Sequence, residues 1–334
     1  MTKNLLMACA AAVLTAPMLT ACGDDGPFIT VYNAQHEELI AEVAPLFEGE
    51  TGIEVKLRSG SDLELANQLV QEGDASPADV FLTENSPAMS LVDNAGLFTK
   101  VDQETLDLIP PEYVPANRNW IGFMGRSTVA MYNTDALGEE DMPDSILDFA
   151  DPEWADRISY SPTGADFQAI VSAVLELEGE QATREWLSGL AENGTEYDGN
   201  DVVLEAVDSG EVDAGIAYHY YWYRDQKEAG EHSDNSELHF FDDQDPGAFV
   251  SVSGAGVLAS SDKQTNAQKF VNFLAGIDGQ QAIADSYALE YPLNADVSLE
   301  PPVKPFAELE PPRVDASTLN SEQVIELMQD AGLL

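Results

Sequence analysis

The sequence predicts an α/β fold of two lobes joined by a hinge, with a central cleft between them. Strand-like and helix-like segments alternate between residues 28 and 83, which is typical of a parallel sheet covered by helices. A second alternating region begins near residue 145, and strand-like runs at residues 121–132 and 248–258 can cross between the two. The 334 residues are enough for two domains.

The first region is predicted to be β-α-β-α-β. Its apolar residues recur at strand spacing in residues 28–33, 53–57 and 78–83, and at helix spacing in residues 36–48 and 62–72. In an open α/β sheet, ligands bind outside the carboxyl ends of the strands. His36 follows the first of these strands and Glu84 follows the third, so both are candidate site residues.

The second region has a similar order and predicts the rest of both lobes. We expect helices at residues 165–178, 181–192, 202–209, 222–229, 266–275, 279–286 and 321–331, with a strand at residues 214–217. From this order, lobe 1 is predicted to hold residues 28–125 and 250–300, and lobe 2 residues 126–249 and 301–334.

The N-terminus predicts export. Lys3 is the only charge before Asp24, and the apolar run between them is typical of a signal peptide over residues 1–21. Leu-Thr-Ala-Cys at residues 19–22 resembles a bacterial lipobox, so we expect a lipid on Cys22 and a tether over residues 22–27. The alternative is an ordinary secretory signal that contains a cysteine. No later apolar run reaches the roughly 20 residues of a membrane span, so we expect an extracytoplasmic protein attached only through lipid.

The charge is strongly negative. Asp and Glu number 61 against 14 Lys and Arg, giving a net charge of −47. This argues against nucleic acid as a partner, because binding to nucleic acid depends on basic residues that neutralise phosphates. The acids are spread along the chain, as expected of a solvated surface in salt or at alkaline pH. The only other cysteine, Cys9, lies in the predicted signal peptide, so no disulfide or cysteine metal site is expected.

The run Ala-Tyr-His-Tyr-Tyr-Trp at residues 217–222 concentrates phenols at a predicted strand-to-helix turn. Core packing is one interpretation, and metal ligation by Tyr220 and Tyr221 is the other. Deprotonating one tyrosine at pH 7 requires about 4 kcal/mol. A trivalent ion about 2 Å from a phenolate attracts it by roughly 25 kcal/mol at an effective dielectric constant of 20. A divalent ion has less margin, so paired phenols favour ferric iron.

The chain resembles the ferric-ion-binding proteins of bacterial iron-uptake ABC transporters, an extracellular solute-binding family. The matching segments are ITVYNAQHEE (29–38), TGIEV (51–55), ADVFLTEN (78–85), GRSTVAMYNT (125–134), GNDVVLEAV (199–207), AYHYYW (217–222) and DQDPGAFVSVSGAGVL (243–258). The resemblance implies a type II periplasmic-binding-protein-like fold. It also implies partnership with an ABC permease and ATPase, a monomer, and no enzymatic activity.

The resemblance also implies a site. The iron ligands would be His36 and Glu84 from one lobe and Tyr220 and Tyr221 from the other. A small anion such as phosphate or carbonate would bind beside the iron. Its pocket would be formed by Thr163, Gly164, Ala165, Asn200 and Arg126.

The sequence departs from the family pattern in two places. Asp166 stands where an uncharged small residue is common, and its carboxylate would repel an anion. Tyr218 and His219 replace the usual amides, so either is a candidate to complete the metal shell.

The predicted function is therefore capture of ferric iron in the cleft and delivery to the permease. Two alternatives stay open. One is a receptor of the same fold for a polyamine or an oxyanion. The other is a secreted hydrolase that uses Glu84 and His36 as acid and base, although no nucleophile motif accompanies them.

Overall fold

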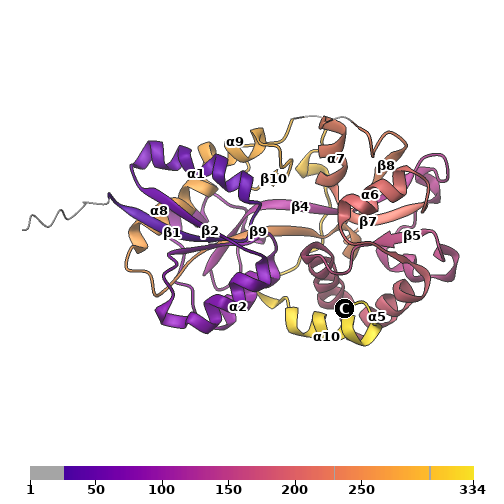
Figure 1. Ribbon diagram of the computed structural model, residues 1–334, viewed down its shortest axis with the longest axis horizontal. Coiled ribbons are helices and arrows are strands. Elements are labelled where there is room, and N and C mark those ends of the chain that lie inside the picture. The colour runs from indigo at the N-terminus through magenta and orange to yellow at the C-terminus, as the bar shows by residue number, and fades with distance from the viewer. Residues whose placement is uncertain (1–25, 229, 301) are drawn as a thin grey trace, which may run out of the picture.

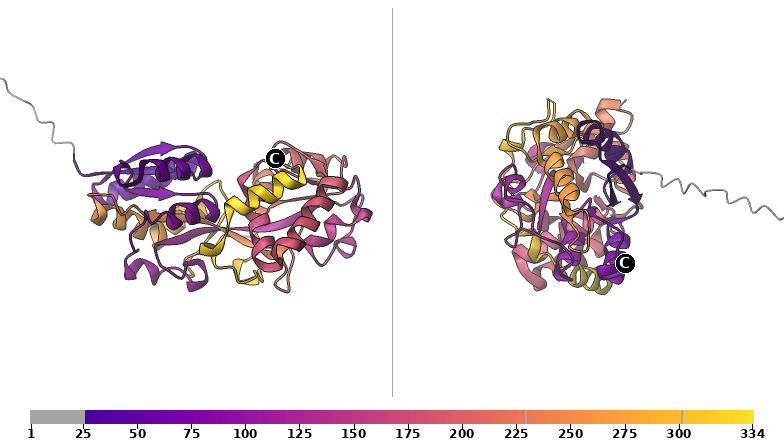
Figure 2. Two further views of the ribbon diagram at one scale, coloured as in Figure 1. Left: turned by 90° about the horizontal axis from the view of Figure 1, so that it is seen from below. Right: turned by 90° about the vertical axis from the view of Figure 1, so that its left-hand side faces the viewer.

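The computed structural model describes residues 26–228, 230–300 and 302–334. The predicted signal peptide, Cys22 and most of the predicted tether lie outside these residues. Within them the molecule has two lobes side by side along its longest axis, as the views in Figures 1 and 2 agree. None of the helices in the three described ranges has the length and apolar character to cross a membrane.

Two strands, β4 and β9, connect the lobes (Figure 1). The strands follow the order β2-β1-β3-β9-β4-β7-β5-β6, and both β8 and β10 pair with β4. Their bounds are β1 Phe28–Asn33, β2 Glu54–Ser59, β3 Val80–Leu82, β4 Trp120–Asn133, β5 Ile158–Tyr160, β6 Thr195–Glu196, β7 Ala214–Tyr218, β8 Ser236–His239, β9 Val250–Val257 and β10 Tyr291–Pro292.

Helices pack on the faces of this sheet. Their bounds are α1 Glu37–Thr51, α2 Asp62–Glu72, α3 Ser86–Asn94, α4 Gln103–Leu106, α5 Ala165–Asn193, α6 Asn200–Asp208, α7 His219–Glu228, α8 Gln264–Ala275, α9 Ile277–Asp285 and α10 Ser321–Ala331. The helices of lobe 1 include α1, α2, α8 and α9, and those of lobe 2 include α5, α6 and α7 (Figure 1).

Strand β4 belongs to both lobes. Its first half pairs with β9 in lobe 1, from Trp120 to Ser127. Its second half pairs with β7 from Thr128 to Tyr132 and with β8 at its far end. All of its residues are buried. A side chain at the middle of β4 therefore lies at the junction of the lobes, and Arg126 occupies that position.

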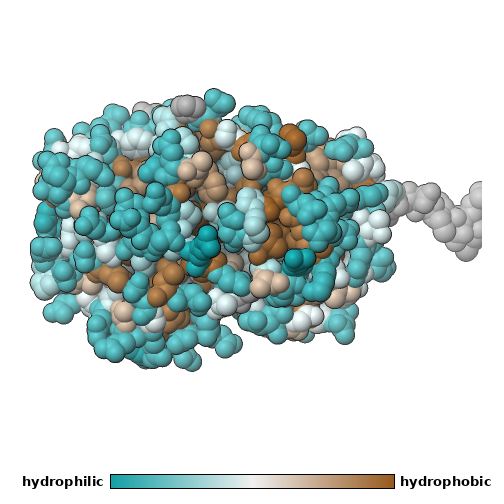
Figure 3. All heavy atoms as spheres, turned by 180° about the vertical axis from the view of Figure 1, so that it is seen from behind, coloured by the Kyte–Doolittle hydropathy of each residue, from teal (hydrophilic) through white to brown (hydrophobic). Residues whose placement is uncertain are grey.

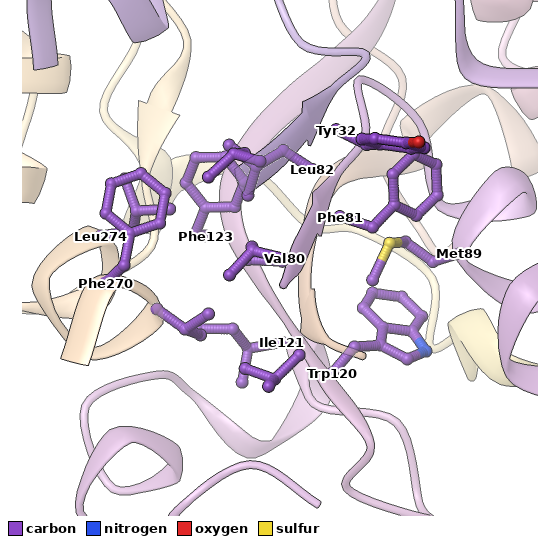
Figure 4. Close-up of a cluster of buried hydrophobic side chains, with 14 of the residues drawn as sticks. Tyr32, Val80, Phe81, Leu82, Met89, Trp120, Ile121, Phe123, Phe270 and Leu274 are labelled. Atoms are coloured by element: carbon purple, nitrogen blue, oxygen red, sulfur yellow. The ribbon is translucent and has the colours of Figure 1, made fainter. Parts of the chain in front are cut away.

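Each lobe has its own apolar core. Figure 4 shows part of the lobe 1 core, where side chains from β3, β4, α3 and α8 meet. The labelled residues there are Tyr32, Val80, Phe81, Leu82, Met89, Trp120, Ile121, Phe123, Phe270 and Leu274. A separate cluster in lobe 2 is built around Phe149, Phe167 and Trp186.

Hydrophilic side chains cover most of the face in Figure 3, as the high charge leads one to expect. We keep the predicted lobe boundaries as a proposal.

The structure tests two of the predicted helix boundaries. The break predicted between the helices at residues 165–178 and 181–192 is confirmed, because the backbone of α5 is not helical at Gly179, where φ is 84° and the helix kinks. The start predicted at residue 222 for the helix after β7 is wrong, because α7 begins at His219. Contacts of the His219 ring to other parts of the chain hold this first turn in place, and they are not visible in local sequence. Tyr220 and Tyr221 therefore lie in the first turn of a helix.

Candidate metal centre

Four side chains predicted as ligands lie close together where the lobes meet. His36 precedes α1 and Glu84 lies between β3 and α3, both in lobe 1, while Tyr220 and Tyr221 come from α7 in lobe 2. The His36 Nε2 atom is 3.7 Å from Glu84 Oε1. The ring centroids of His36 and Tyr220 are 5.9 Å apart, and those of Tyr220 and Tyr221 are 4.2 Å apart and stacked.

Asp166 lies at the middle of this group, in the first turn of α5. Its Oδ2 atom accepts hydrogen bonds from Tyr221 at 2.9 Å, from Asn200 at 3.0 Å and from Tyr220 at 3.4 Å. Its Oδ1 atom accepts one from Asn85 of lobe 1 at 3.2 Å. Helix N-termini stabilise negative charge, and α5, α6 and α7 each begin here. The sequence prediction treated Asp166 as a departure and missed its central position.

Arg126 is fully buried and contacts three carboxylates. Its Nη1 atom is 3.0 Å from Glu84 Oε1 and 3.5 Å from Asp166 Oδ1. Its Nε atom is 3.1 Å from Glu290 Oε2, and its Nη2 donates to Ser253 at 2.7 Å. A buried charge needs paired partners, and the guanidinium supplies the counter-charge for these acids.

Glu290 was not among the predicted site residues. It is fully buried, and its Oε1 atom is 3.2 Å from His36 Nε2. The sequence signal that could have found it is a lone acid within the otherwise apolar run Ala288-Leu289-Glu290-Tyr291-Pro292-Leu293. Ionisable side chains are almost never fully buried unless they are paired, so an acid in such a run indicates a partner.

Asp62 holds the turn that carries Glu84. The Asp62 carboxylate is buried and accepts the backbone N–H groups of Glu84 and Asn85, both at 2.8 Å. These contacts orient the start of α3 and leave the Glu84 side chain facing Arg126. Asp62 therefore orders the lobe 1 half of the centre without entering it.

Tyr218 and His219, the two candidates for completing the metal coordination shell, lie in different positions relative to the centre. The Tyr218 hydroxyl donates to the backbone oxygen of Asp166 at 3.3 Å, beside the centre. His219 uses both of its ring nitrogens elsewhere. Its Nδ1 accepts the Ser127 N–H at 3.2 Å, so Nε2 carries the proton and donates to the Leu289 carbonyl at 3.1 Å. With both nitrogens engaged, His219 has no free ligand atom.

The predicted anion pocket is only partly assembled. Asn200 and Arg126 direct their polar groups to Asp166, which has the charge that an anion would have supplied. Gly164 is the N-cap of α5 and Ala165 is its first residue, while the Thr163 side chain is exposed. An anion at this site stays a prediction.

A metal ion at this centre would need the phenol groups of Tyr220 and Tyr221 as ligands. Throughout the described part of the chain, His, Cys, Asp and Glu side chains alone form no group of three that could hold a metal ion. Adding Tyr220 and Tyr221 to His36, Glu84 and Asp166 gives five nitrogen and oxygen donors that converge from both lobes. Such a donor set suits a hard, highly charged cation.

Comparison with known proteins identifies the family. Residues 75–317 match the bacterial extracellular solute-binding protein family. The chain belongs to this family. It is 51% identical to the Fe(3+)-binding periplasmic protein of Serratia marcescens, over 97% of each chain. It is 42% identical to the major ferric iron-binding protein of Neisseria meningitidis serogroup B, over 96% of this chain and 97% of that protein.

The fold of this solute-binding protein matches that of a solved, iron-bound structure. Iron-bound HitA from Pseudomonas aeruginosa superposes with a TM-score of 0.86 at 42% identity. The match covers 92% of this chain and 100% of that one. The predicted two-lobed α/β fold and the resemblance to ferric-ion-binding proteins are therefore confirmed.

The electrostatics of this solute-binding protein keep the phenols protonated while no metal is present. Burial raises the pKa of Tyr220 and Tyr221 well above the ordinary value, and the nearby Asp166 charge raises both further. Burial also raises the pKa of Glu84 to about 7, against the opposing effect of Arg126. Both tyrosines therefore donate hydrogen bonds, and a metal ion must displace their protons.

Proposed function

We propose that this solute-binding protein captures ferric iron between its lobes and delivers it to an ABC permease and its ATPase. The observation that carries this proposal is the convergence of Tyr220 and Tyr221 on Asp166, beside His36 and Glu84. Relatives named for ferric iron binding span nearly the whole chain and support the same conclusion. We also propose that the protein acts as a monomer held to the membrane by lipid on Cys22.

The proposed ligands are His36, Glu84, Asp166, Tyr220 and Tyr221. When both phenols are ionised, two carboxylates and two phenolates carry four negative charges, which match a trivalent ion better than a divalent one. We propose that the Asp166 carboxylate supplies the charge that a separate anion was predicted to supply. Iron binding then releases the two phenolic protons.

Loading requires the lobes to separate and close again. His36 and Glu84 lie on one lobe and Asp166 and the two tyrosines on the other, so opening separates the two groups of ligands. Strands β4 and β9 are the connections along which a hinge motion would act. On closure, the ion would compete with Arg126 for Glu84 and Asp166, the acids that now pair with the guanidinium.

The test is a titration of the metal-free protein with ferric nitrilotriacetate. Charge transfer from phenolate to iron should colour the protein in proportion to the iron added, with saturation at one ion per chain. Tyr221→Phe should weaken both the colour and the affinity. Thermal-shift measurements with spermidine and with phosphate would detect a polyamine or oxyanion receptor. If the mixture stays colourless and either compound raises the melting temperature, a polyamine or oxyanion receptor would replace the ferric-iron proposal.

A further inference from the structure

Glu290 is a buried acid that the proposed ligand set does not use. Its two carboxylate oxygens face two different partners. Oε2 lies 3.1 Å from Arg126 Nε, and Oε1 lies 3.2 Å from His36 Nε2. Both Oε1 and His36 Nε2 are buried, and among the described residues neither has a hydrogen-bond partner, so their approach is an ion-pair contact that is not aligned as a hydrogen bond. Two carboxylates lie near His36 Nε2, and Glu290 at 3.2 Å is closer to it than Glu84 at 3.7 Å.

The backbone around Glu290 directs this carboxylate inward. Leu289 is buried and has φ of 55°, a left-handed conformation that is unfavourable for a bulky side chain. The Leu289 carbonyl accepts the proton of His219 Nε2, which stabilises the turn. Tyr291 follows directly and pairs with Gly125 of β4, beside Arg126. The acid is therefore held from both sides, by a strained residue before it and a strand pair after it.

We propose that Glu290 is a positioning residue for iron binding that holds the His36 ring ready for the metal. This inference rests on the proposed function. In the metal-free protein, Glu290 contacts Nε2 and keeps the ring within 3.7 Å of Glu84. When iron arrives, the proton on Nε2 is exchanged through solvent to Nδ1 of the partly exposed ring, the Nε2 lone pair turns from Glu290 to the ion, and Glu290 remains paired with Arg126. The ring is then already ordered, so less conformational freedom is lost on binding.

The carboxylate is required because its two negatively charged oxygens face two nitrogens at once, Arg126 Nε and His36 Nε2. A glutamine at position 290 has only one acceptor oxygen, and the charged Arg126 competes for it most strongly. The amide NH₂ then faces His36 and donates to Nε2, so the lone pair needed for the metal is occupied. Outer partners of metal ligands typically contribute about 10- to 100-fold in metal affinity. We expect a loss in that range for Glu290→Gln.

A double-mutant cycle on the full chain tests this inference. Iron affinity is measured by competition with citrate for the wild type, E290Q, H36A and the double variant. We expect E290Q to lower the affinity about 10- to 100-fold in the wild-type background and several-fold less in the H36A background. Equal factors in both backgrounds would overturn the inference, because Glu290 would then act independently of His36.

A metal-free measurement separates this inference from the proposed function. The chain has four histidines, so ¹⁵N imidazole signals can be assigned by comparison with H36A. At alkaline pH we expect His36 Nε2 to be protonated in the wild type and unprotonated in E290Q. Identical His36 signals in the two proteins would overturn the inference whether or not iron binds. If the wild type takes up no iron while the signals differ, the positioning contact stands and the proposed function fails.

Two further variants control for stability. Asp79 is a buried acid that pairs with Lys263 at the end of β3 opposite Glu84, so Asp79→Asn should change stability and leave iron affinity unchanged. Glu290→Asp keeps the charge beside Arg126 and withdraws the carboxylate from His36 by one methylene. It should lower the affinity less than E290Q does. A wild-type affinity and a wild-type His36 signal in Glu290→Asp would count against the positioning contact.

Discussion

The Tyr221 hydroxyl donates a hydrogen bond of 2.9 Å to Asp166 Oδ2, the same atom that accepts from Asn200. The donors expected to hold a small anion thus already hold a carboxylate of the protein. Iron binding by the wild type should therefore be independent of added anion.

Asp166→Ala should make iron binding depend on an anion. Removing the carboxylate leaves Asn200, Asn85 and the tyrosines without their acceptor, and it opens space at the N-terminus of α5. We expect a loss of iron affinity of at least about tenfold in anion-free buffer, since one close counter-charge is removed. Phosphate or carbonate should restore part of it. The measurement is a ferric titration with and without each anion. An equal anion response in wild type and variant would contradict the prediction.

Asp62→Asn should disturb the lobe 1 half of the centre from a distance. An amide accepts with one oxygen, so one of the N–H groups of Glu84 and Asn85 loses its partner. An unsatisfied buried donor costs about 1–3 kcal/mol, so the free energy of unfolding should fall by this amount. Iron affinity should fall as Glu84 loses its orientation. Glu64→Gln is the matched control, because Glu64 is exposed on the same turn of α2. Urea unfolding and ferric titration report the two effects, and parallel behaviour of both variants would refute the role of Asp62.

Gly254→Ala should destabilise the strand β9 that links the lobes. A Cβ atom at Gly254 would lie 2.2 Å from Cγ of Met89, which is too close for two carbon atoms. Overpacking of this kind typically costs about 1–3 kcal/mol. The Met89→Ala, Gly254→Ala double variant shortens the neighbouring side chain and should relieve the clash. Its loss in free energy of unfolding should therefore be smaller than the sum of the losses of the two single variants.

Gly49→Ala provides the contrast for that experiment. Gly49 lies in α1, and nothing would contact its added Cβ within 4 Å. We expect a gain of about 0.5–1 kcal/mol in the free energy of unfolding, because alanine restricts the unfolded chain. Chemical denaturation of the metal-free proteins measures all of these values. Additive effects of Gly254→Ala and Met89→Ala would show that the predicted clash does not occur.

His219 should make the metal-free protein less stable in mild acid. Burial lowers the pKa of His219 from 6.5 to about 4, so the folded state keeps the ring neutral where the unfolded chain binds a proton. The unfolded state then binds more protons between these values, and stability falls as the pH falls through this window. The contribution of this group is complete above about pH 6.5 and declines by about 3 kcal/mol by about pH 4.

His219→Gln keeps a donor toward the Leu289 carbonyl and removes the titration. We expect the wild type to be more stable at neutral pH and the difference to shrink in acid. The other titrating groups are shared by the two proteins, so their contributions cancel in the difference. Urea unfolding across a pH series measures the gap, and a gap that does not change with pH would disprove the assignment.

Local pattern predicted most of the elements. Alternation and helical spacing placed β1, α2 and α10 at their observed bounds, because each has one apolar face that must be buried. The residue types at strand ends pointed to His36, Glu84, Tyr220 and Tyr221, since hydroxyl, carboxylate and imidazole groups have recognisable ligand chemistry. The start of α7 was placed three residues late, because tertiary contacts of His219 set it.

The sequence by itself determined the two-lobed α/β architecture, the acidic surface and the ligand types available for a hard cation. Only the tertiary structure decided which charges meet. Asp166, Arg126 and Glu290 lie far apart along the chain, and no local pattern shows that they meet. They become one centre because β4 crosses both lobes and carries Arg126 to the junction, where burial leaves each charge dependent on the others.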